Sequence, residues 1–141
     1  MDPSVQMITD VLKGMGIDPA SCQLPDSGGR GWLVQTGPVP MFVVIAEIDS
    51  LPALRLTCPI LYMPAFELLP FYRKMLDLNM ELVSVSLGMD RDIVCVVCQQ
   101  ALDGLTPTAA EALMKRTLKS ADVLGDLLLR EFPTARYWSP M

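Results

Sequence analysis

Near the start of the chain, apolar residues recur every three or four positions, which is the spacing of one face of a helix. Asp2 followed by Pro3 is typical of a helix start, with the aspartate as N-cap and the proline in the first helical position. Gly14 and Gly16 predict where this helix ends. The prolines and the Asp-Ser-Gly-Gly run in the next stretch, residues 17–30, predict a loop.

Three segments with strand-like patterns follow that loop. Residues 31–36 form a short one, and residues 53–58 alternate between apolar and polar positions as a half-buried strand does. Residues 41–48 are almost wholly apolar, which is typical of a strand covered on both faces. Pro59 and Pro64 then predict that the third strand ends at a sheet edge or at a bulge.

The second half of the chain changes from helix to strand, to strand again, and back to helix. Residues 67–79 carry two neighbouring apolar stripes at helical spacing, so this helix would cover more than one surface. Residues 81–87 alternate, and a turn at 88–92 leads into a strand at 93–99, which together predict a hairpin. Residues 107–131 form the last helix, about 37 Å long at 1.5 Å per residue.

Single residues support these boundaries. Pro70 fits only in the first turn of its helix, Asn79 suits a left-handed position at the end of that helix, and Thr106 suits an N-cap before Pro107. The element order is α-β-β-β-α-β-β-α. Short connections favour a twisted antiparallel sheet of about five strands with three helices on one face. We predict a single α+β domain over residues 1–141.

The composition is apolar and acidic. Of the 141 residues, 51% are hydrophobic and 19% are charged, so some apolar surface is expected to remain for a partner or a second copy of the chain. The ten methionines suit such an adaptable surface, or they fill gaps in the core. A net charge of -5 disfavours nucleic acid as a direct partner. The longest apolar run, Met41 to Ala46, is too short for a membrane helix, and no secretory signal is visible, so we expect a cytoplasmic protein.

The cysteine motif Cys95-Val96-Val97-Cys98 is the strongest chemical signal in the chain. Its spacing occurs in zinc and thiol redox sites, but here it falls inside a predicted strand. Residues three apart on a strand point to opposite faces, so the two sulfur atoms diverge. We therefore interpret both cysteines as small buried apolar residues.

No other motif predicts catalysis or metal binding. The chain has no histidine, so the usual base for a nucleophile is missing. Asp90 and Asp92 lie in a predicted turn and lack the glycine and distal glutamate of a calcium loop. Glu47 and Asp49 are the carboxylates best placed for acid–base work, but solvated carboxylates are ordinary at a strand end. We expect no catalytic residue, no metal and no cofactor.

The segment YRKMLDLNMELVSVSLGMDRDIVCVVCQQALDGLTPTAAEALMKRTLKSAD resembles the YbjN-type family, whose members share the fold of the type III secretion chaperones. The matching features are the helix closing on Leu-Asn, the alternating hairpin, and the Leu-x-Gly-Leu-Thr-Pro entry into a long last helix. The resemblance implies a small acidic bacterial protein, usually a homodimer, with neither cofactor nor catalysis. The related secretion chaperones hold a client segment in extended form against exposed strands and apolar patches.

We therefore predict a chaperone-like or regulatory homodimer that binds an unidentified partner protein, with a small-ligand sensor or a dedicated secretion chaperone as alternatives. The predicted dimer interface is one stripe of the second helix and a residue beyond it: Leu69, Tyr72, Leu76 and Val83. The alternative is that these residues face the chain's own sheet. The predicted partner site treats the third strand as a sheet edge open to main-chain pairing. It comprises Leu54, Leu56, Tyr62, Met63 and Phe66, with Trp138 as a further contact.

Overall fold

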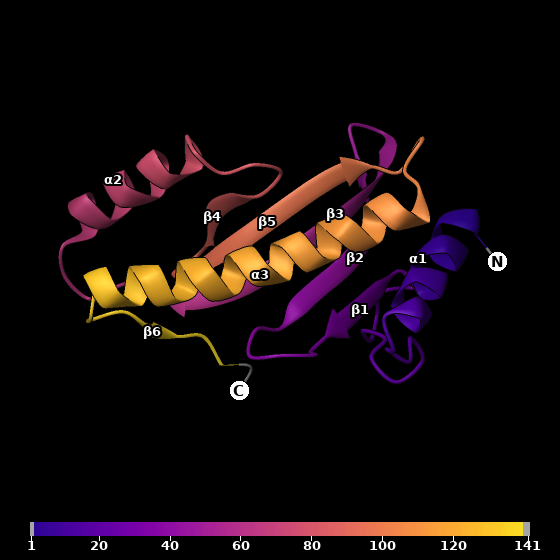
Figure 1. The fold of residues 1–141 in the computed structure, drawn as a ribbon, viewed down its shortest axis with the longest axis horizontal. Coiled ribbons are helices and arrows are strands. Elements are labelled where there is room, and N and C mark those ends of the chain that lie inside the picture. Colours follow the sequence, from indigo (N-terminus) through magenta and orange to yellow (C-terminus); the bar gives the residue numbers. More distant parts are fainter. Residues whose placement is uncertain (1, 140–141) are drawn as a thin grey trace.

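The structure, a computed structural model, describes residues 2–139 (Figure 1). Its elements follow the predicted order, with one short strand added at the end. They are α1 Pro3–Gly14, β1 Gly31–Val34, β2 Met41–Ile48, β3 Leu51–Tyr62, α2 Leu68–Asn79, β4 Ser86–Asp90, β5 Ile93–Ala101, α3 Pro107–Glu131 and β6 Arg136–Tyr137. The α+β class and the order α-β-β-β-α-β-β-α are confirmed.

All strands pair antiparallel in one sheet of order β1-β2-β3-β5-β4. β6 lies off this path and pairs with the end of β3. β3 is therefore the central strand, flanked by β2 on one side and β5 on the other. The prediction that β3 is a sheet edge is wrong, because an alternating pattern looks the same in a central strand as at an edge.

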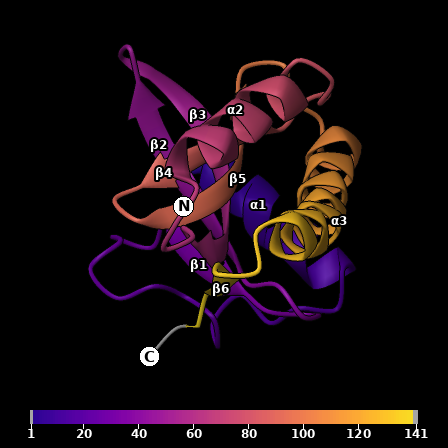
Figure 2. The same ribbon diagram turned by 90° about the vertical axis from the view of Figure 1, so that its left-hand side faces the viewer.

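The helices lie against one face of the sheet, where α3 packs on β3 and β5 and α1 packs beside α3 (Figures 1 and 2). The largest buried side chains, among them Trp32, Phe71 and Leu56, come from all three helices and from β1, β2 and β3. α2 lies near β4 and is tied to the end of α3, where the rings of Phe71 and Phe132 meet edge-on with centroids 5.0 Å apart. The sheet's other face carries no helix among the described residues.

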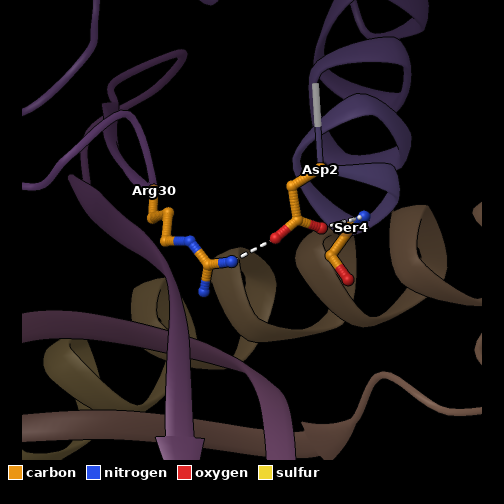
Figure 3. A network of polar contacts seen from close by, with 3 residues as sticks. All are labelled: Asp2, Ser4 and Arg30. Atoms are coloured by element: carbon orange, nitrogen blue, oxygen red, sulfur yellow. Dashed lines mark hydrogen bonds and ion pairs between the residues drawn. The ribbon is translucent and has the colours of Figure 1, made fainter.

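Both predicted helix caps are present. The Asp2 carboxylate accepts the Ser4 N–H at 2.8 Å and also forms an ion pair with Arg30, which fastens the start of α1 to the strand region (Figure 3). The Thr106 hydroxyl oxygen accepts the Ala109 N–H at 3.1 Å at the start of α3. Each such cap satisfies a backbone donor that the helix itself leaves free.

Two boundaries differ from the prediction. β3 continues through Pro59 to Tyr62, and the register of its pairing with β5 shifts there, so the predicted bulge is present although the strand does not end. β4 begins at Ser86 rather than at residue 81, because the chain leaves α2 through a bend with Ser84 at φ 68°. The predicted turn shortens accordingly to the two residues before Ile93.

Asn79 does not adopt the predicted left-handed conformation. Its side-chain amide reaches β4 instead, accepting the Leu87 N–H at 2.7 Å and donating to the Leu87 carbonyl at 3.1 Å. The amide thus imitates a neighbouring strand on the outer edge of β4. A hydrogen-bonded side chain of this kind is one way in which proteins blunt an exposed strand edge.

Candidate partner-binding surfaces

α2 divides its apolar residues between two surfaces. Phe71 and Met75 are buried against the domain, whereas the other stripe projects outward. The exposed fractions are 79% for Leu69, 68% for Leu76 and 40% for Tyr72. These residues do not face the chain's own sheet, so that alternative is wrong.

The exposed stripe continues past the end of α2, where Met80 and Val83 are both exposed. We call Leu69, Tyr72, Leu76, Met80 and Val83 the α2 surface. A contiguous apolar patch of this kind is more typical of an interaction site than of a free helix face.

Two of the residues predicted to bind a partner lie in the core. Leu54 and Leu56 are 1% and 0% exposed, because β3 is central and their side chains point toward the helices. They cannot contact another protein in this fold. Both leucines take part in packing the domain, and the predicted site is corrected accordingly.

The remaining predicted contacts are accessible and lie around the end of β3. Phe66 is exposed in the loop before α2, and Tyr62 and Met63 are half-buried. Trp138 is half-buried as well, and its ring meets Phe42 edge-on with centroids 6.4 Å apart. The structure thus brings Tyr62 and Trp138 to the same end of the sheet, beside β6.

The face of the sheet that carries no helix forms an open groove of about 850 Å³. We call it the outer-face groove. It is lined by alternate residues of β2, β3 and β5 and by parts of β4 and the C-terminal segment. Its apolar lining includes Phe42, Val44, Ala46, Ile93 and Val97.

Sequence reasoning missed this groove because β2 was interpreted as covered on both faces. Only its inward residues Met41, Val43 and Ile45 are fully buried, and the alternate outward ones remain half-buried. Apolar residues on both faces of a strand were the available signal. This pattern is the same for a strand covered on both faces and for a strand with one uncovered apolar face. The two cases can be told apart only when it is known whether another layer packs on the sheet.

The charges within the groove are few. Arg55 and Asp90 line it, among otherwise uncharged residues. The Cys95 thiol also faces it, while Cys98 lies on the opposite face near Thr117, so the two sulfurs diverge as predicted. Burial, with a smaller contribution from the charge of Asp90, raises the pKa of Cys95 to about 11. The thiol is therefore protonated at neutral pH, whereas nucleophilic cysteines are thiolates.

Other parts of the chain hydrogen-bond to both lateral edges of the sheet. Beside β1, the Leu24 N–H donates to the Gly31 carbonyl and the Leu33 N–H donates to the Cys22 carbonyl, each at 2.8 Å. Beside β4, the amide of Asn79 takes the place of a strand. These contacts cover the main chain of β1 at Gly31 and Leu33 and that of β4 at Leu87, which reduces the main chain open to pairing with another protein.

Within residues 2–139, no group of three or more histidine, cysteine or acidic side chains is placed to hold a metal ion. No helix in the same part of the chain combines the length and apolar character needed to cross a bilayer. The candidate surfaces for function are therefore the α2 surface, the outer-face groove and the region around β6.

No protein-family model matches the sequence, and no curated protein matches it. Solved structures do match the fold. A chain of the ExsC–ExsE complex aligns with a TM-score of 0.67 and 18% identity, covering 91% of this chain and 97% of that chain. The Yersinia pestis type III secretion chaperone SycH, in complex with a stable fragment of YscM2, aligns with a TM-score of 0.58 and 12% identity over 86% and 98% of the two chains.

YbjN from E. coli aligns with a TM-score of 0.60 and 12% identity, covering 96% of this chain and 98% of that chain. At these identities the similarity establishes the fold alone. The agreement extends over nearly the full length of both chains, so it describes the whole domain rather than one shared motif. The protein therefore has the YbjN-type fold that is shared with the type III secretion chaperones.

Proposed function

We propose that the protein is a non-enzymatic, homodimeric, chaperone-like protein that binds an extended segment of a partner protein. The observation that carries the proposal is the outer-face groove, which has a volume of about 850 Å³, a largely apolar lining and no covering layer among the described residues. SycH, which shares the fold, was solved in complex with a fragment of another protein. The absence of histidine from the sequence and the protonated state of Cys95 support a binding role over catalysis.

The α2 surface supports the homodimer. Burying a fully exposed leucine is worth roughly 1.5–3 kcal/mol. Leu69 is 79% exposed, so burying it contributes about 1.2–2.4 kcal/mol in each copy. In a twofold interface the same residue is buried twice, which doubles this contribution.

Light scattering coupled to size exclusion tests the dimer. Wild-type protein is expected to have twice the monomer mass at micromolar concentration, and Leu69→Asp is expected to have the monomer mass. Leu51→Asp is the matched control, because Leu51 is 62% exposed at the β2–β3 turn, at the other end of β3 from α2. A monomeric wild-type protein, or a dimer that survives Leu69→Asp, contradicts this part of the proposal.

Affinity capture with mass spectrometry tests the partner site. Val97 points into the middle of the outer-face groove and is half-buried, so Val97→Asp places a charge on the binding surface with little effect on the core. We expect a specific partner to be recovered with wild type and with Leu51→Asp, but not with Val97→Asp. Leu54→Asp is unsuitable because it would bury a charge in the core. Equal recovery with wild type, Leu51→Asp and Val97→Asp contradicts the groove as the binding surface.

One observation favours small-ligand binding as a second candidate function. A cavity of about 400 Å³ lies between α3, the end of β3 and β6, which is within the usual size of small-molecule sites. A ligand there would raise the melting temperature of the wild-type protein, and Asp126→Lys at the cavity wall would remove that increase. A metabolite screen by thermal shift distinguishes this function from partner binding.

A further inference from the structure

The C-terminal segment fills a strand-binding position on β3. β2 pairs with β3 only as far as Thr57, while β5 pairs along the opposite side of β3 to its end. β6 occupies the side that β2 leaves free, pairing antiparallel with the last two residues of β3. The Trp138 N–H continues this pairing by donating to the Ile60 carbonyl at 3.0 Å. We call the stretch Ile60–Tyr62 the β3 slot.

The segment that fills the β3 slot buries little of itself. Arg136 and Tyr137 are exposed, and Trp138 is half-buried. Its side-chain contacts lie at the surface of the domain, and they include a hydrogen bond from the Tyr137 hydroxyl to Asp126. The Arg136 guanidinium carbon lies 4.4 Å from the centre of the Tyr62 ring, and the Trp138 ring meets Phe42 only edge-on. A segment that buries so little surface gives little resistance to local opening.

The cover on β3 is also short. β6 pairs with β3 at two positions only, Leu61 with Tyr137 and Tyr62 with Arg136, and the Trp138 N–H adds one further main-chain hydrogen bond. The side chain of Ala135, just before β6, is buried.

The cavity beside the β3 slot shows which side chains the slot accepts. Its walls are mostly small or apolar, and the buried Gly125 of α3 lets the Tyr137 ring lie close to the helix. Two carboxylates, Asp122 and Asp126, also line it, and the Tyr137 hydroxyl donates to Asp126. This hydrogen bond, together with burial and the charges of the two carboxylates, raises the pKa of the Tyr137 phenol. Arg130 opposes this shift with its positive charge, and the two carboxylates outnumber it. Asp122 and Asp126 would therefore stabilise a cationic side chain at this position.

Trp138 separates this cavity from the outer-face groove. The indole lines both of them, as does Pro59 of β3. If the C-terminal segment left, the two spaces would join along the end of β3. An extended chain in the β3 slot would then run directly into the groove that the proposed function assigns to the partner.

We propose that an extended partner segment, carrying a basic side chain followed by an aromatic one, displaces β6 and pairs antiparallel with the β3 slot. This inference rests on the proposed function and names the chemistry of its partner. The basic side chain takes the position of Tyr137, beside Asp122 and Asp126, and the aromatic one takes the position of Trp138, against Phe42. The net charge of -5 favours encounter with such a basic segment.

A peptide titration followed by amide NMR shifts tests the proposal. The probe is the capped peptide Ala-Arg-Lys-Trp-Lys, and its charge-reversed control is Ala-Arg-Glu-Trp-Glu. Both are added to the full chain and to the full chain with Tyr137→Ala and Trp138→Ala, which weakens the resident segment without removing it. Amide shifts are expected in the β3 slot and in residues 122–126 of α3.

The expected result is tighter binding of the basic peptide once the resident segment is weakened. If the slot is open in about a tenth of wild-type molecules, the double substitution raises the affinity up to about tenfold. Replacing both carboxylates, Asp122→Lys with Asp126→Lys, is expected to reverse the preference so that the acidic peptide binds better. Both aspartates are exposed on α3, so this change leaves the core intact.

Three results would overturn the inference: equal affinity for wild type and the double variant, no shifts with millimolar peptide in a folded double variant, or no response to charge reversal. Shifts confined to the outer-face groove would also overturn it, while leaving the proposed function in place. The dimer and capture experiments change Leu69 and Val97 and leave the C-terminal segment unaltered, so the two proposals can fail separately.

Discussion

Gly125 offers a quantitative test of how the C-terminal segment is seated. It lies in the interior of α3, where glycine costs about 0.8–1.0 kcal/mol relative to alanine. A Cβ built there would lie 3.7 Å from the Ile60 Cβ and 3.8 Å from the Tyr137 Cε1, which are ordinary van der Waals distances. Gly125→Ala should therefore recover the helix propensity without a steric penalty and stabilise the protein by about 1 kcal/mol.

Thermal unfolding followed by circular dichroism measures this effect. For a chain of this length, about 1 kcal/mol corresponds to a rise of roughly 3–5 °C in melting temperature. Ala112→Gly is the matched control, because Ala112 is exposed in the same helix and reports the effect of helix propensity without packing. Its expected change is a loss of about 1 kcal/mol. The difference in magnitude between the two variants isolates packing at position 125.

A destabilised Gly125→Ala protein would refute this reasoning, since it would mean that the methyl group collides with β3 or with the Tyr137 ring. The two contacts can be separated by repeating the measurement with Tyr137→Ala. If the collision is with the ring, the penalty disappears in the double variant. If it is with Ile60, the penalty remains.

Three further predictions concern single side chains. Asn79→Ala removes two hydrogen bonds to Leu87 and should lower the free energy of unfolding by about 1–3 kcal/mol in urea titrations, with a smaller loss for Asn79→Asp, which keeps an acceptor. The pKa of Tyr137 is raised, so its hydrogen bond to Asp126 is fully present below about pH 10, the ordinary tyrosine value, and is lost as the pH rises through the raised pKa. Phenolate absorbance, with Tyr137→Phe as the reference, should show Tyr137 ionising above about pH 10, and the C-terminal segment should be released over the same pH range. The Cys95 thiol, with a pKa of about 11, should resist alkylation at neutral pH in the folded protein and react once it is unfolded.

Signals within a few residues of each other predicted much of the fold. The bounds of α3 follow from Thr106, Pro107 and the apolar spacing up to Glu131, and the structure places them at those residues. The bounds of β2 are also as predicted. In each case the chain carries its own start and stop signals, so no distant contact is needed to locate the element.

The candidate binding sites could not be located in this way, because they are formed by contacts between residues that are far apart in the sequence. Whether Leu54 and Leu56 face a partner or the core is decided by the strands on either side of β3, and one of these, β5, comes only after α2 and β4 in the chain. Pro59 predicts either an edge or a bulge because it lacks an N–H to donate, and the register shift shows that the bulge is the correct alternative. β6 is two residues long and gives no periodic pattern at all.

The two apolar stripes of α2 were recognisable from the sequence, and they predicted an exposed apolar surface. Two apolar stripes on one helix require two apolar surroundings, and the structure supplies only one of them, through Phe71 and Met75. A single exposed leucine needs no explanation. Leu69 and Leu76 share a face with Tyr72, and the exposure continues beyond the helix, so the hydrophobic surplus in the composition is concentrated rather than scattered.

The proposed dimer interface and the proposed peptide-binding site lie on different parts of the domain. The α2 surface belongs to α2 and the bend after it, whereas the β3 slot lies at the end of β3, and the cavity beside it is lined by residues of α3. A substitution that dissolves the dimer through Leu69 should therefore leave peptide affinity at the β3 slot unchanged, because substitutions without shared partners act additively. If Leu69→Asp abolished peptide binding as well, the slot would need the second copy to be complete, and the dimer would be part of the binding site rather than a support for it.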